Sequence, residues 1–186
     1  MAKTQVKKQK QVLIISSTPR KKGNSQVLCE QFLKGAREAG HKAEIIRIAD
    51  KKIAYCKGCG ACHKIGKCVI KDDMTAIINK MLKADVIVLA TPVYFYCMSA
   101  QLKTMIDRCA SKYTEISGKE FYFIITAADT NKKIMDKVIE ALRGFTRDCL
   151  EGTKEKAIIC GLGVWQMGEI QKKPAFERAY KLGLKA

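Results

Sequence analysis

The chain has 186 residues, a net charge of +17 at pH 7 and an apolar content of 47%. This length suits one domain, and the apolar content argues against a disordered chain. No apolar run approaches the length of a membrane helix, and the run Val12–Ile15 is too short for a secretory signal peptide. We therefore expect a cytoplasmic protein with no membrane partner.

Part of the positive charge lies at the start of the chain. Four lysines within residues 1–10 form a short basic arm. We expect this arm to be disordered and residues 11–186 to form a single domain. A positive surface attracts phosphorylated ligands, but no nucleic-acid-binding motif accompanies it, so we expect no specific nucleic acid partner.

Strand-like and helix-like segments alternate along the chain. Continuous apolar runs predict buried strands at residues 12–16, 43–48, 86–90, 121–126 and 157–160. Helical spacing of apolar residues predicts helices over residues 26–39, after Asp72 or Asp73, and over residues 99–108, 133–147 and 174–184. A cysteine-rich loop spans residues 54–70, and a loop with proline and aromatic residues spans residues 91–96.

This alternation predicts an α/β fold. It should be a doubly wound, five-stranded parallel sheet of order 2-1-3-4-5, with helices on both faces. Ligands of such sheets bind beyond the carboxyl ends of the strands, where the strand order reverses. The loops after the first and third strands should therefore open onto one crevice.

The stretch Ser17–Ser25 joins the first strand to its helix. A tight loop that ends at the positive end of a helix dipole is a phosphate site. The stretch lacks both the Walker ending and the dinucleotide glycine fingerprint, so a mononucleotide such as FMN is the predicted ligand. The predicted phosphate ligands are Thr18, Arg20, Asn24 and Ser25. The alternative is an ordinary strand–helix turn that uses the conformational tolerance of Gly and Asn.

The loop Pro92–Tyr96 follows the third strand. Proline stiffens it, and its aromatic side chains could flank a flat conjugated ring. The alternative is a plain connection whose aromatic residues cover the sheet edge.

Together, Ser16–Ser25 and Thr91–Phe95, with the helix behind the second motif, resemble the flavin loops of the NAD(P)H-dependent FMN reductase family. This resemblance runs from about Val12 to Leu182 and implies a flavodoxin-like fold. It implies that the four residues named above hold the FMN phosphate. It further implies that the flavin ring is framed by Pro92, Val93, Tyr94, Phe95 and, in a third loop, Ala127.

The same resemblance implies an activity. The protein would transfer a hydride from NADH or NADPH to FMN and pass electrons to a second, small-molecule acceptor. It would form a homodimer or homotetramer, and no side chain is assigned a catalytic role. The chain departs from the pattern of the family at Ser17 and Tyr96, where the family often has Gly. A third departure is Asp129, which would place a negative charge near the flavin ring.

A second motif gathers four cysteines within thirteen residues: Cys56, Cys59, Cys62 and Cys68. Four thiolates at short spacings can hold a [4Fe-4S] cluster, whereas free or reactive thiols and a zinc or other metal site are the alternatives. The motif resembles that of the iron–sulfur flavoproteins of the same group. That resemblance implies an alternative function, electron transfer with a ferredoxin-like partner and without nicotinamide.

The remaining cysteines are expected to be buried as small apolar residues. Cys97 is the exception to watch, because it adjoins the second flavin loop. Trp165 is expected either to pack within the last loop or to reach the flavin of a partner subunit.

Overall fold

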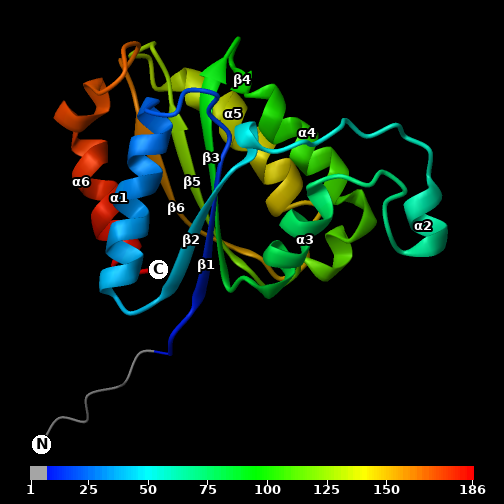
Figure 1. The fold of residues 1–186 in the computed structure, drawn as a ribbon. Coiled ribbons are helices and arrows are strands. Elements are labelled where there is room, and N and C mark those ends of the chain that lie inside the picture. Colours follow the sequence, from blue (N-terminus) through cyan, green and yellow to red (C-terminus); the bar gives the residue numbers. More distant parts are fainter. Residues whose placement is uncertain (1–7) are drawn as a thin grey trace, which may run out of the picture.

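The computed structural model describes residues 8–186 (Figure 1). Residues 1–7, which hold most of the predicted basic arm, lie outside the described residues. Lys10 is already tied to the body of the protein, because its Nζ donates to Glu120 at 2.8 Å and its backbone N–H donates to His41 at 3.2 Å. Within residues 8–186, no helix combines the length and the apolar character needed to cross a bilayer.

The sheet contains five parallel strands in the order β2-β1-β3-β5-β6. Their bounds are β1 (Gln11–Ser16), β2 (Lys42–Arg47), β3 (Val86–Tyr94), β5 (Glu120–Thr126) and β6 (Lys154–Gly161). The short strand β4 (Cys97–Met98) pairs antiparallel with the end of β3. Counting the parallel strands alone, the predicted order 2-1-3-4-5 and the doubly wound α/β fold are confirmed.

Helices cover both faces of the sheet (Figure 1). One face carries α1 (Asn24–Glu38) and α6 (Pro174–Gly183). The other carries α3 (Met74–Lys83), α4 (Ala100–Arg108) and α5 (Lys133–Thr146). The shorter elements are α2 (Ala61–Ile65) and the 3₁₀ turns η1 (Ile48–Asp50), η2 (Cys109–Ser111), η3 (Tyr113–Glu115) and η4 (Glu169–Lys172).

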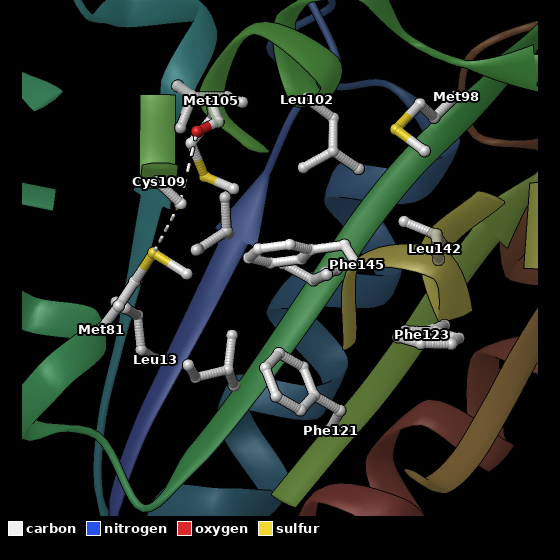
Figure 2. Packing of buried hydrophobic residues seen from close by; sticks show 14 of the residues in the cluster. Leu13, Met81, Met98, Leu102, Met105, Cys109, Phe121, Phe123, Leu142 and Phe145 are labelled. Carbon is white, nitrogen blue, oxygen red and sulfur yellow. Dashed lines mark hydrogen bonds between the residues drawn. The ribbon is translucent and has the colours of Figure 1, made fainter. Parts of the chain in front are cut away.

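The core lies in two layers because the strands alternate their side chains between the two faces. Leu13 packs in the layer under α3, α4 and α5, whereas Val12 and Ile14 pack in the layer under α1 and α6. Figure 2 shows the first layer, with Phe121 and Phe123 of β5 beside Phe145 of α5. Burial on both faces explains why the strands are continuously apolar in sequence.

The helices α1 and α6 touch at their backbones. A Cβ added to Gly35 would lie 2.2 Å from the carbonyl oxygen of Tyr180, and one added to Gly183 would lie 2.2 Å from that of Phe32. Only glycine fits at either crossing point. This contact fixes α6 against α1, and both helices follow loops that reach the carboxyl edge of the sheet.

Two segments differ from the sequence prediction. The third strand does not stop at residue 90 but continues to Tyr94, because Val93 and Tyr94 find ladder partners in β4. Within the cysteine-rich loop, which the sequence predicts as irregular chain, lies the short helix α2, flanked by the left-handed cap residues Gly60 and Gly66.

Candidate functional site

A cavity of about 410 Å³ lies at the carboxyl edge of the sheet. Its walls come from the carboxyl ends of β3 and β5, from the start of α1, and from the connections that follow β1, β3, β5 and β6. All nine residues predicted to bind the cofactor line this one cavity. The complete lining is Thr18, Arg20, Gly23, Asn24, Ser25, Pro92, Val93, Tyr94, Phe95, Thr126, Ala127, Ala128, Val164 and Trp165.

The connection between β1 and α1 presents the start of a helix to the cavity. Gly23 is the N-cap of α1, no side chain caps the helix, and its first turn contains no acidic residue. The first N–H groups of a helix have no partner within the helix, and they lie at the positive end of its dipole. This end of the cavity is therefore suited to an anion.

The buried hydroxyl of Ser25 indicates whether a phosphate fits at the start of α1. Ser25 Oγ has no hydrogen-bond partner among the described residues, although a buried polar group normally finds one. Gly23 keeps the loop tightly closed, because a Cβ at this position would lie 2.7 Å from Thr18 Oγ1. A phosphate oxygen would supply the partner that Ser25 lacks, so these residues fit the group.

Two of the predicted phosphate ligands already bind the loop between β6 and α6. Arg20 NH1 donates to the carbonyl oxygen of Trp165 at 2.9 Å. The amide of Asn24 donates to the carbonyl of Gln166 at 2.9 Å and accepts from the backbone N–H of Ile170 at 3.3 Å. Both the nitrogen and the oxygen of the Asn24 side-chain amide are thus already hydrogen-bonded, so only its backbone N–H can bind an anion. Arg20 uses one guanidinium nitrogen for Trp165 and keeps its other N–H donors.

Buried hydroxyls tie the first loop to the second. Ser99 Oγ donates to Ser17 Oγ at 2.8 Å, and Ser17 Oγ donates to the carbonyl of Ala90 at 2.8 Å. The backbone N–H of Ser99 donates to Thr91 Oγ1 at 2.9 Å, and Ser99 also caps α4. Ser17 therefore has a structural partner in this chain, which accounts for serine where the resemblance suggested glycine.

The loop after β3 ends in a strained hairpin turn. Tyr94 pairs with Cys97, so Phe95 and Tyr96 form a two-residue turn, and both have positive φ values, +48° and +61°. Turns of this kind normally use Asn and Gly, because other residues are strained there. The turn holds the ring of Phe95 fully in solvent at the cavity mouth.

Several lining residues were not predicted from the sequence. Thr126 and Ala128 extend the third loop, and Val164 and Trp165 follow β6. These residues could have been predicted from the topology, because the loops that follow parallel strands all lie at the carboxyl edge of the sheet. Asp129 was expected near the ligand ring, but it does not line the cavity, and its carboxylate accepts from the N–H of Asn131 at 2.7 Å.

The cysteine-rich loop lies apart from this cavity. Cys56 and Cys59 are exposed, and Cys62 and Cys68 are half-buried. Within residues 8–186, no three Cys, His, Asp or Glu side chains are grouped as metal ligands. Four thiols suit an iron–sulfur cluster chemically, but this structure does not bring the four predicted ligands together.

Comparisons with known proteins identify the family of the chain. The sequence model of the NADPH-dependent FMN reductase family matches residues 11–144. An iron–sulfur flavoprotein of Methanocaldococcus jannaschii is 45% identical over 97 residues, which are 52% of this chain and 50% of that protein. Another, from Archaeoglobus fulgidus, is 34% identical over 167 residues, which cover 76% of this chain and 85% of that protein.

A solved structure extends the likeness to the whole fold. The NAD(P)H:quinone oxidoreductase of Methanothermobacter marburgensis superposes with a TM-score of 0.75 and 17% identity, covering 96% of both chains. The chain spans about half the length of the Methanocaldococcus relative and most of the Archaeoglobus relative. The chain therefore belongs to the NADPH-dependent FMN reductase family, a family of flavodoxin-like FMN oxidoreductases, and has iron–sulfur flavoproteins among its relatives.

Proposed function

We propose that this protein is an FMN-dependent NAD(P)H oxidoreductase that passes electrons to a small-molecule acceptor. One observation carries the proposal. The residues expected to bind FMN, at the carboxyl edge around β1, β3 and β5, line a single cavity. Among them is the buried hydroxyl of Ser25, which has no hydrogen-bond partner within residues 8–186.

The phosphate of FMN would be held at the start of α1. Ser25 Oγ and the first N–H groups of the helix supply neutral donors, and Arg20 supplies positive charge. Hydrogen bonds from a guanidinium to a phosphate are roughly twice as strong as neutral ones. Thr18 completes the loop and orients its backbone by accepting from the N–H of Arg20 at 3.3 Å.

The flavin ring would lie against Pro92–Phe95 and the small residue Ala127. FMN bound here would supply the redox chemistry, which is hydride acceptance from nicotinamide and electron delivery to the acceptor. The lining contains no Asp, Glu, His, Lys or Cys among the described residues. The chain's own side chains therefore bind and orient the ligand, and exclude water from it.

The direct test is turnover by the FMN-loaded protein. Protein reconstituted with FMN should oxidise NADH or NADPH when an acceptor such as a quinone or free flavin is supplied. A protein that retains FMN but oxidises neither nicotinamide with any acceptor would overturn the proposed activity while leaving the binding site intact.

A second candidate is an iron–sulfur flavoprotein that exchanges electrons with a ferredoxin-like partner. It is supported by the relatives that bear this name and by the four cysteines of the loop. It requires the loop to rearrange so that the thiols converge. Protein purified without oxygen should then contain about four irons and equal acid-labile sulfide per chain, whereas metal-free protein would reject this candidate.

A further inference from the structure

Trp165 is a large aromatic side chain that is 65% exposed and lines the cavity. It is also the only tryptophan in the chain. An exposed aromatic residue at the mouth of a cavity, rather than one scattered on the surface, indicates a contact that is made only when the cavity is filled.

The backbone around Trp165 is held on both sides. Glu169 Oε2 accepts from the N–H of Trp165 at 2.6 Å and from the N–H of Gln166 at 2.9 Å. The carbonyl of Trp165 accepts from Arg20, and the carbonyl of Gln166 accepts from Asn24. The indole of Trp165 therefore extends from a fixed backbone, although most of the side chain is exposed to solvent.

Trp165 shares the cavity lining with the aromatic hairpin that contains Phe95. Phe95 follows β3, and Trp165 follows β6 in a loop that reaches Arg20 after β1. The loop that follows β5 contributes the small residues Ala127 and Ala128 to the lining. A cavity lined by aromatic side chains and small residues is suited to a flat ring system.

We propose that Trp165 binds the ring of the flat ligand in this cavity, and that Glu169 positions it. This inference rests on the proposed flavin site, because it takes flavin as the ligand. Aromatic contacts of this kind change affinity by about 3- to 10-fold.

The test compares FMN with riboflavin, which has the ring but no phosphate. Trp165→Ala should weaken the binding of both by the same factor, about 3- to 10-fold, and Trp165→Phe should restore part of the affinity. Met167→Ala is the matched control, because Met167 is 61% exposed in the same loop but does not line the cavity. Unchanged affinity of Trp165→Ala for both ligands, equal to that of Met167→Ala, would overturn the proposal.

The positioning role of Glu169 has its own test. Glu169→Ala removes the acceptor of two N–H groups and should weaken riboflavin binding as much as Trp165→Ala does. Glu169→Gln keeps a carbonyl oxygen in place and should rescue it. Equal riboflavin affinity of the wild-type protein and Glu169→Ala would reject this role.

These outcomes can be distinguished from failure of the proposed function. A wild-type protein that binds neither FMN nor riboflavin overturns the flavin site itself, and the role of Trp165 falls with it. A wild-type protein that binds both, with an affinity that Trp165→Ala leaves unchanged, overturns the role of Trp165 alone.

Discussion

Arg108 and Asp72 form a two-pronged ion pair that closes the base of the cysteine-rich loop. Arg108 NH1 lies 2.6 Å from Asp72 Oδ2, and Arg108 NH2 lies 3.0 Å from Asp72 Oδ1. Both groups also hold Ala54, whose carbonyl accepts from Arg108 at 2.6 Å and whose N–H donates to Asp72 at 2.9 Å. The two ends of the loop are thus joined to each other and to the end of α4.

The first prediction concerns the stability of this pair. Its side chains are only 1% and 9% exposed. Asp72→Ala leaves a buried guanidinium without its carboxylate and should lower the free energy of unfolding by about 3–5 kcal/mol, measured by urea denaturation. The control is Glu177→Ala, which breaks the exposed pair with Lys181 and should change the free energy by at most about 0.5 kcal/mol. Equal effects of the two substitutions would contradict this account.

The second prediction concerns pH. Burial opposes ionisation of Asp72, but the hydrogen bonds from Arg108 and from two backbone N–H groups outweigh it and lower the pKa below the ordinary value of 3.8. The Asp72 carboxyl binds fewer protons in the folded than in the unfolded state. Its contribution to the free energy of unfolding is therefore present above pH 3.8 and is lost as the pH falls through the lower, folded-state pKa. The stability difference between the wild-type protein and Asp72→Asn should therefore shrink over that acidic range. A stability difference between the two proteins that does not change with pH would refute this prediction.

The third prediction concerns the crossing of α1 and α6. Gly183→Ala should destabilise the protein by about 1–3 kcal/mol, because the added methyl group would collide with the backbone of Phe32. Gly144→Ala in α5 is the control, since a Cβ there meets nothing within 4 Å. That substitution should raise stability by about 0.5–1 kcal/mol through helix propensity. Thermal unfolding of both variants distinguishes a steric effect from a general effect of Gly→Ala.

The fourth prediction concerns thiol reactivity. Burial raises the pKa of Cys29 and of Cys109 to about 12, so neither forms an appreciable amount of thiolate at pH 8. The exposed Cys97 and Cys149 should react with a disulfide reagent well before these two do. Mass mapping of briefly labelled native protein checks the order, and early labelling of Cys109 would show that the packing in Figure 2 is wrong.

The local sequence was sufficient to predict the parallel sheet and the position of the loop between β1 and α1. The apolar runs that became β1 and β3 are buried on both faces, so their character is visible without knowing their neighbours. The stretch from Ser17 to Ser25 is a contiguous strand–loop–helix unit, and its position at the sheet edge follows from strand order. Ser25, which the sequence predicts as a phosphate ligand, lines the cavity at this edge.

Contacts between distant segments could not be predicted in the same way. The sequence predicts Asn24 as a phosphate ligand, whereas its side-chain amide binds a loop more than 140 residues away, at Gln166. The ion pair between Arg108 and Asp72 joins residues 36 positions apart, so no local sequence pattern predicts it. The hairpin at Phe95 and Tyr96 was missed because a two-residue turn of aromatic residues contradicts turn propensities.

The central claim is that the start of α1 binds the phosphate of FMN, and one binding measurement tests it. The affinities of FMN and riboflavin are compared for the wild-type protein and for Arg20→Ala combined with Ser25→Ala. The double substitution should weaken FMN binding about 100-fold or more, through the loss of charge-assisted and hydroxyl hydrogen bonds. Riboflavin binding should weaken by at most about 10-fold, because Arg20 also holds the carbonyl of Trp165. A wild-type protein that fails to take up FMN, or a double variant that retains FMN as tightly as the wild type, would contradict the account.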